Sequence, residues 1–136
     1  MSGFNHPKPF KPRKDEPRDD PDWEIGFFEG IVQNSPNHVD ALVNLGNLYT
    51  KRGEFVKGLE VDKRLVRLRP EDPIIHYNLA CSLSLVGHLE AAVDELKKTV
   101  ELGYSDYDYM LADEDLGNIR KDPRFCEFVE RLLKRV

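Results

Sequence analysis

Few side chains in this sequence of 136 residues combine the types and spacing that catalysis needs. Four histidines are scattered along the chain, at His6, His38, His76 and His88. The sequence has no glycine-rich phosphate loop and no Gly-x-Ser-x-Gly motif. Asp113, Glu114 and Asp115 are consecutive, but adjacent residues on one helix point in different directions, which argues against a paired-carboxylate site. We therefore expect a protein that is not an enzyme and that binds no cofactor.

The two cysteines offer no metal site either. Cys81 and Cys126 are far apart, and neither has a second cysteine or a histidine nearby at the spacing of metal ligands. No base in the sequence context of Cys81 would activate its thiol, so we interpret Cys81 as a packing or groove residue. The sequence predicts two free thiols and no bound metal.

Charge and hydropathy exclude two further classes of function. The net charge of −5 argues against broad attraction to nucleic acid. No segment approaches the ~20 consecutive apolar residues of a membrane span, and residues 1–10 lack the apolar stretch of a signal peptide. We expect a cytoplasmic protein that binds neither nucleic acid nor membrane. Basic residues outnumber acids in residues 51–69, and residues 101–115 contain acids but no basic residue. We therefore expect a molecule that is basic in one part and acidic in another.

The elements that position any binding residue follow a repeat of 34 residues. Residues 39–72 align with residues 73–106, and this register pairs Gly46 with Ala80 and Gly58 with Ala92. These small residues are expected where paired helices approach most closely. The pattern predicts helices over residues 38–51, 55–68 and 89–102, and another that starts at Pro73 and turns at Gly87.

This pattern resembles the tetratricopeptide repeat. The resemblance is carried by Leu42, Leu45, Gly46, Tyr49, Gly53, Phe55, Gly58 and Leu65, with Pro70 closing the first copy. It implies an all-α fold, a right-handed superhelix of antiparallel helix pairs. It also implies a protein that binds other proteins.

The repeat divides the chain as follows. Residues 1–21 contain five prolines and are predicted to be a disordered tail. Residues 22–136 form the helical domain, with a half repeat at 22–36 that Asp22 would cap. Full repeats cover 39–72 and 73–106, and no third full repeat is expected. Residues 107–136 resemble a closing element of capping helices, in which an Asp-Pro-Arg-Phe motif at 122–125 starts the last helix.

In the family the first helix of each repeat lines a concave groove that holds a peptide or helix of a partner. Carried over position by position, the groove residues are Asp40, Val43, Asn44, Asn47, Thr50 and Lys51 in the first repeat and Ile74, Tyr77, Asn78, Cys81, Ser84 and Leu85 in the second. Asn47 and Asn78 could each donate to and accept from a peptide backbone. An alternative is that the two amides only form hydrogen bonds that hold neighbouring helices in register.

The resemblance does not extend to every binding property of the family. Val43 stands where members that bind heat-shock chaperone tails carry a lysine, so that ligand is not expected. Tyr104, Tyr107 and Tyr109 alternate with acids and could contact a basic partner or simply pack the cap. A polyproline-like pattern at residues 9–14 could bind a partner or fold back onto the acidic part of the chain.

We interpret the chain as a non-catalytic scaffold or adaptor. The alternative is a self-association module that pairs two copies through the N-terminal helix. Trp23, Phe27 and Phe28 motivate this alternative, because they are a heavy apolar load for a helix without its own pair.

Overall fold

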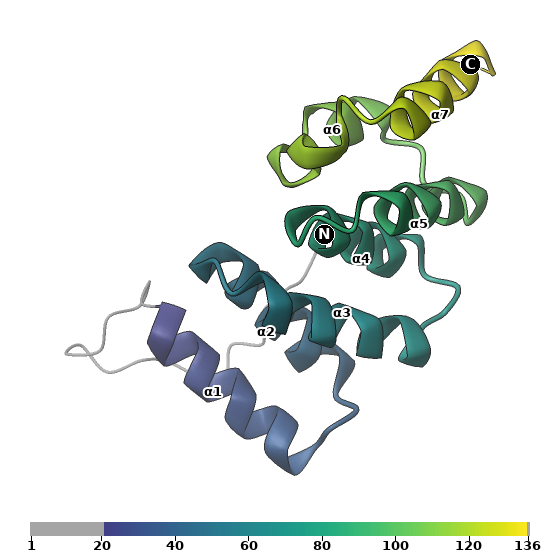
Figure 1. Ribbon diagram of the computed structural model, residues 1–136. Helices are drawn as coiled ribbons and strands as arrows, with labels where there is room; N and C mark the ends of the chain where they lie inside the picture. Colours follow the sequence, from purple (N-terminus) through teal and green to yellow (C-terminus); the bar gives the residue numbers. More distant parts are fainter. Residues whose placement is uncertain (1–20, 136) are drawn as a thin grey trace.

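The computed structural model describes residues 21–135, and every regular element in this range is helical. In chain order the elements are α1 (Pro21–Asn34), α2 (Val39–Arg52), α3 (Phe55–Leu68), α4 (Pro73–Leu85), α5 (Leu89–Glu101), α6 (Tyr107–Ala112), the 3₁₀ helix η1 (Glu114–Ile119) and α7 (Pro123–Lys134). They stack in chain order from α1 at one end to α7 at the other (Figure 1). No helix within residues 21–135 is long and apolar enough to cross a membrane. The predicted tail, with its proline pattern, lies outside the described residues.

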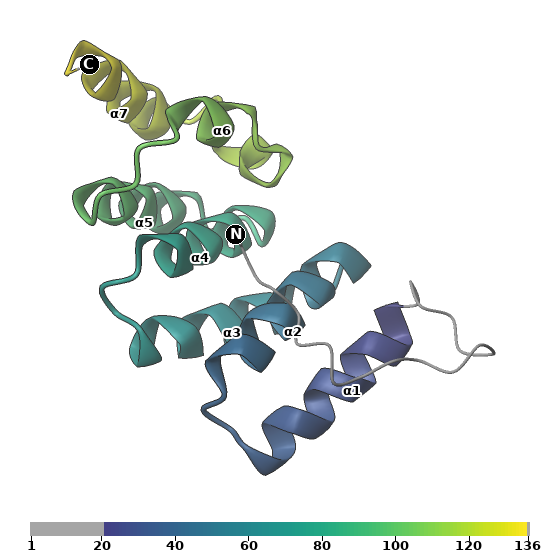
Figure 2. The same ribbon diagram turned by 180° about the vertical axis from the view of Figure 1, so that it is seen from behind.

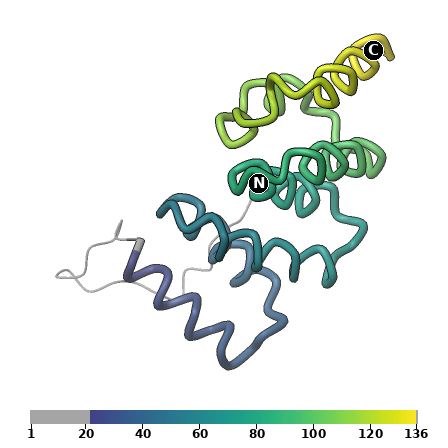
Figure 3. The backbone as a smooth tube through the Cα atoms, viewed as in Figure 1, coloured from purple at the N-terminus to yellow at the C-terminus, as the bar shows by residue number. Residues whose placement is uncertain are grey.

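Two helix pairs repeat with the spacing that the sequence predicts. The starts of α2 and α4, Val39 and Pro73, are 34 positions apart, and so are the starts of α3 and α5, Phe55 and Leu89. The chain reverses direction between the helices of each pair in a short turn, which the backbone tube makes visible (Figure 3). Gly53 and Gly87 occupy these turns with φ of 88° and 86°, a left-handed conformation that side chains disfavour.

The helix starts are fixed by side chains that satisfy free backbone amides. Asp72 Oδ1 accepts from the amide of Ile74 at 2.9 Å, and His38 Nδ1 accepts from the amide of Ala41 at 3.1 Å. The predicted cap at Asp22 is wrong, because α1 already begins at Pro21. Proline suits the first turn of a helix, where its missing amide hydrogen loses no bond.

The C-terminal segment differs from the expectation of two simple capping helices. Here α6 and α7 begin at Tyr107 and Pro123, each 34 positions after the matching helix of the preceding pair. The segment is therefore a third pair whose first helix is broken. The break lies at Asp113, whose extended backbone (φ −69°, ψ 120°) separates α6 from η1. The guanidinium of Arg120 stabilises this break by donating hydrogen bonds to the carbonyls of Leu111 and Asp113.

Close packing between paired helices depends on small residues. A methyl group added at Gly46 of α2 would lie 3.2 Å from Asp62 Oδ1 and 3.3 Å from Val61 Cγ1 on α3. One added at Gly58 of α3 would lie 3.1 Å from Thr50 Oγ1 on α2. In the second pair, Ala80 and Ala92 have no exposed surface. Seen from behind, the consecutive helices from α1 to α5 remain side by side (Figure 2). The small residues thus lie where the sequence predicts the closest approach.

Two polar side chains tie helices together inside this packing. Ser82 of α4 donates a hydrogen bond to the buried carboxylate of Asp62 on α3. His76 of α4 is also buried, with Nδ1 2.6 Å from Glu95 Oε2 on α5 and Nε2 2.7 Å from the carbonyl of Pro70. Both groups therefore join elements that are distant in sequence.

A leucine at Gly46 is expected to destabilise the fold. The side chain cannot enter the α2–α3 contact without separating the helices, and overpacking of this kind lowers the free energy of unfolding by about 1 to 3 kcal/mol or more. The matched control is Gly30→Leu on α1, where an added methyl group meets no atom within 4 Å. The control should be neutral or up to ~1 kcal/mol more stable, because glycine is a poor helix former. Urea denaturation of both variants checks this, and equal stabilities would contradict the observed packing.

The buried Asp62 carboxyl should make stability depend on pH. Burial raises the pKa of Asp62 from its usual 3.8 to about 6, although the hydrogen bond from Ser82 acts in the opposite direction. Because the pKa is higher in the folded state, this group stabilises the fold most below pH ~4 and loses that contribution as the pH rises through ~6.

The variant Asp62→Asn keeps an acceptor for Ser82 and removes the titration. Relative to the parent, its free energy of unfolding should be more favourable by about 2 kcal/mol at pH 7.5 than at pH 4.5. The measurement is urea denaturation at both pH values. Glu60→Gln, at an exposed position on the same helix, serves as the control. A difference that does not change with pH would show that Asp62 is not protonated in this range.

Candidate functional site

A pocket of about 320 Å³ lies beside α4, with α2 on one side and α6 and η1 on the other. We call it the α4 pocket. Its lining residues come from five elements: Asn47, Thr50, Lys51, Asp62, Tyr77, Asn78, Cys81, Ser82, Tyr109, Asp113 and Asp115. The pocket is thus built mainly on the first helices of successive pairs, where the family resemblance implies a groove.

Six of the twelve predicted groove residues line this pocket: Asn47, Thr50, Lys51, Tyr77, Asn78 and Cys81. The other six do not. Asp40 and Ile74 are exposed elsewhere, Val43 is buried among core residues, and Leu85 is half-buried. Asn44 uses its side-chain amide to donate to the carbonyl of Asp40 at 2.8 Å. Ser84 has no exposed surface, so a partner cannot touch it in this structure, which argues against its assignment.

Asn47 and Asn78 come from neighbouring first helices and face the same pocket. Asn47 is exposed and Asn78 is half-buried. Within residues 21–135 neither side-chain amide makes a hydrogen bond. The alternative that these amides hold the helices in register therefore finds no support in the structure. Both remain available to a ligand.

Tyr77 forms one wall of the pocket and is buried. Its hydroxyl donates to Asp113 Oδ2 at 2.6 Å, and its ring stacks on Tyr104 with 5.0 Å between centroids. Burial, followed by the hydrogen bond to Asp113, raises the pKa of the Tyr77 phenol well above its usual value. Tyr77 therefore joins α4 to the start of η1 and keeps its proton, so its contribution to the site is largely structural.

Three carboxylates make the pocket acidic. Asp62 lies at its base, and Asp113 and Asp115 approach from the break between α6 and η1. Burial raises the pKa of Asp115, and the charges of Asp113 and Glu114 add to the rise. Neighbouring acids that repel one another favour a cationic ligand. Lys51 is the one basic residue among those that line the pocket.

Most of this acidic wall is not evident from the sequence. Asp113 and Asp115 flank Glu114, and on a continuous helix their side chains would not point toward one site. The break at Asp113 removes that restriction. The sequence does distinguish Asp62, because the aligned position in the next repeat is an apolar residue, Leu96, which is fully buried in the structure. A polar residue at an apolar repeat position indicates a special site.

Two of the tyrosines that were predicted to contact a partner or pack the cap, Tyr107 and Tyr109, have different surroundings in the structure. Tyr109 is 58% exposed, lines the pocket, and has its ring centroid 6.0 Å from that of Tyr77. The charge of Asp113, followed by burial, raises the pKa of the Tyr109 phenol. Tyr107 instead packs against the core and lies outside the pocket. Tyr109 is therefore the one of these two tyrosines placed to contact a ligand.

Cys81 is buried beside two of the pocket carboxylates. Its thiol lies within 4.8 Å of carboxylate oxygens of Asp113 and Asp115, so the three residues could in principle surround a cation. Burial, together with these charges, raises the pKa of the Cys81 thiol. The thiolate is the nucleophilic form of cysteine, so this environment lowers the nucleophilicity of Cys81. Both cysteines of the described chain are free, with Cys126 exposed.

Curated proteins resemble the chain over about two thirds of its length. A peroxisomal targeting signal receptor from Candida albicans is 29% identical over 105 residues, which is 66% of this chain and 18% of the receptor. The receptor of the same name from Komagataella phaffii is 30% identical over 109 residues, or 68% of this chain and 19% of the receptor. The chain therefore spans less than a fifth of the length of these relatives. No protein-family model matches the chain.

Solved structures share the fold over most of the chain. A structure of MamA from Desulfovibrio magneticus RS-1 has a TM-score of 0.69 at 25% identity, covering 85% of this chain and 64% of the other. Another crystal structure of MamA has a TM-score of 0.66 at 24% identity, covering 85% and 68%. The peroxisomal receptors contain tetratricopeptide repeats, and the MamA fold is of the same type. Together with the 34-residue helix pairs, these relationships identify the chain as a tetratricopeptide-repeat protein with an all-α fold.

Proposed function

We propose that the chain is a non-catalytic scaffold that holds a segment of a partner protein in the α4 pocket. The observation that carries the proposal is the pair of amides of Asn47 and Asn78. They face one pocket from adjacent helices and make no hydrogen bond to any residue of the described chain. Each amide can donate to a peptide carbonyl and accept from a peptide N–H, so together they suit an extended main chain.

The relatives support this class of function. The matching yeast proteins are named as receptors for a peroxisomal targeting signal, and this chain shares repeats with part of them. The environments of Cys81 and His76 add to the case against catalysis, because the thiol keeps its proton and the imidazole is buried between Glu95 and Pro70. The chemistry of the pocket is that of binding.

The charge of the pocket specifies the ligand further. Asp62, Asp113 and Asp115 outnumber Lys51, so a lysine or arginine side chain of the partner would be the favoured occupant. The exposed ring of Tyr109 at the pocket edge adds an aromatic face that attracts cations. We expect the partner segment to place a basic residue beside these acids while its backbone lies along Asn47 and Asn78.

The self-association alternative rests on the apolar load of α1. In the structure, Phe28 packs with Ile25 and Val32 against α2, so one of the three side chains that motivate the alternative is used in this contact. Static light scattering of the full chain over a hundredfold dilution tests the alternative. A dimer mass that persists would support it, whereas a constant monomer mass would exclude it.

Removing both amides should weaken peptide binding. Peptides are first selected from a random display library with the full chain, and their dissociation constants are then measured by fluorescence polarisation. We expect Asn47→Ala with Asn78→Ala to raise Kd at least ~10-fold, which equals the loss of about 1.4 kcal/mol. The matched control is Gln33→Ala with Asn34→Ala, two exposed amides outside the pocket. Equal Kd values for the two double variants would place binding elsewhere.

The acidic wall should select basic ligands. Selected peptides are expected to be enriched in lysine or arginine, and their Kd should rise with salt because exposed charges are screened. Asp115→Asn removes one pocket charge and should raise Kd about threefold to tenfold. Asp94→Asn, an exposed acid on α5 that lies outside the pocket, is the control. Selection of acidic peptides, or an equal effect of the control, would contradict the assigned ligand charge.

A further inference from the structure

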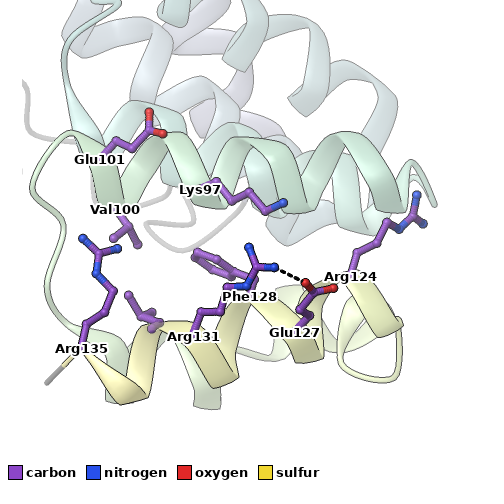
Figure 4. Close-up of a pocket in the computed structure, with 9 residues that line it drawn as sticks. Lys97, Val100, Glu101, Arg124, Glu127, Phe128, Arg131 and Arg135 are labelled. Atoms are coloured by element: carbon purple, nitrogen blue, oxygen red, sulfur yellow. Dashed lines mark hydrogen bonds and ion pairs between the residues drawn. The ribbon is translucent and has the colours of Figure 1, made fainter.

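A second hollow lies between α5 and α7, and we call it the α7 groove. It has a volume of about 400 Å³, within the range of ~300–1,000 Å³ typical of ligand sites. Its apolar floor is formed by Val100 of α5 and by Phe128 and Leu132 of α7. In the close-up, Phe128 points from α7 toward α5, and charged side chains stand along both edges (Figure 4). The α7 groove shares no lining residue with the α4 pocket.

The edges of the α7 groove are predominantly basic. Four of the six charged residues that line it are cations, which are Lys97, Arg124, Arg131 and Arg135. Some of this charge is neutralised within the chain. Arg131 pairs with Glu127 at 2.5 Å, and Arg124 pairs with Asp122 at 2.7 Å. Lys97 and Arg135 form no ion pair with any residue between positions 21 and 135. Two exposed cations therefore flank the floor without an ion-pair partner among the described residues, and the acid Glu101 also lines the groove.

The shape of the groove matches a helix better than an extended strand. Phe128 and Leu132 are four residues apart on α7 and thus form a strip along its axis, with Val100 opposite on α5. A helix lying between α5 and α7 would insert apolar residues spaced at i, i+3 or i+4, and i+7.

We infer that the α7 groove docks an acidic amphipathic helix of another protein. The apolar stripe of that helix covers Val100, Phe128 and Leu132, and its flanking carboxylates pair with Lys97 and Arg135. A hydrophobic stripe would bury the apolar floor, and carboxylates beside that stripe would pair with the two cations. This ligand differs in charge from the one assigned to the α4 pocket.

The test uses a fluorescent, hydrocarbon-stapled helical peptide about four turns long, with leucines on one face and glutamates on the rest. Two twins share its staple. One replaces the glutamates with glutamine, and the other replaces the leucines with serine. The full chain should bind the parent peptide at least ~10-fold more tightly than either twin. Equal binding of the glutamine twin would overturn the charge argument, and equal binding of the serine twin would overturn the apolar floor.

The location is tested with variants of the chain. Lys97→Glu with Arg135→Glu should weaken binding of the acidic peptide at least ~10-fold. Lys63→Glu with Arg67→Glu makes the same charge change on exposed positions of α3 and should have an effect below ~3-fold. Asn47→Ala with Asn78→Ala should leave binding unchanged. Equal losses in the two charge variants, or loss in the amide variant, would refute docking in the α7 groove.

Discussion

The separation between paired helices is the constraint on which the remaining structure depends. Gly46 and Gly58 allow α2 and α3 to approach until their backbones nearly touch, and Ala80 and Ala92 fill the equivalent positions of α4 and α5 without any exposed surface. Because this distance is set in each pair, successive first helices lie close enough for Asn47 and Asn78 to face one pocket. A wider spacing would separate the two amides and expose the carboxylate of Asp62 to water.

The broken helix of the third pair gives the pocket its chemistry. If α6 continued as one helix, Asp113 and Asp115 would point in different directions. Instead Arg120 binds the carbonyls of Leu111 and Asp113, and the Tyr77 hydroxyl binds the Asp113 carboxylate. These bonds hold an irregular segment against α4 and bring two acids to the pocket edge. The helical backbone hydrogen bonds that are lost at the break are replaced by these side-chain hydrogen bonds, which also position the pocket carboxylates.

The repeat signals in the sequence were sufficient for α1 to α5, but they did not predict the broken third pair. The 34-residue period, the turn glycines Gly53 and Gly87, and the Asp72 cap determine helix starts and stops within one or two residues. The family resemblance located about half of the pocket, because six of the residues that line it occupy groove positions of the repeat. It could not locate Asp113 and Asp115, since a helix break held by Arg120 from a later turn is a tertiary effect. Asp62 lies between these two cases. Its position follows from the repeat, but its role in the pocket is indicated only by the contrast with Leu96 at the aligned position of the next repeat.

The two surfaces differ in charge because the two helices of each pair carry different residues. Asp113 and Asp115 line the α4 pocket at the break between α6 and η1, whereas several arginines of the α7 segment line the α7 groove. The cations of the α7 groove lie outside residues 51–69, so they form a basic surface that the charge pattern of the sequence did not predict. A partner with a basic segment and a partner with an acidic helix would each be repelled from the other's site. This arrangement suits a scaffold that holds two different ligands at once without competition between them.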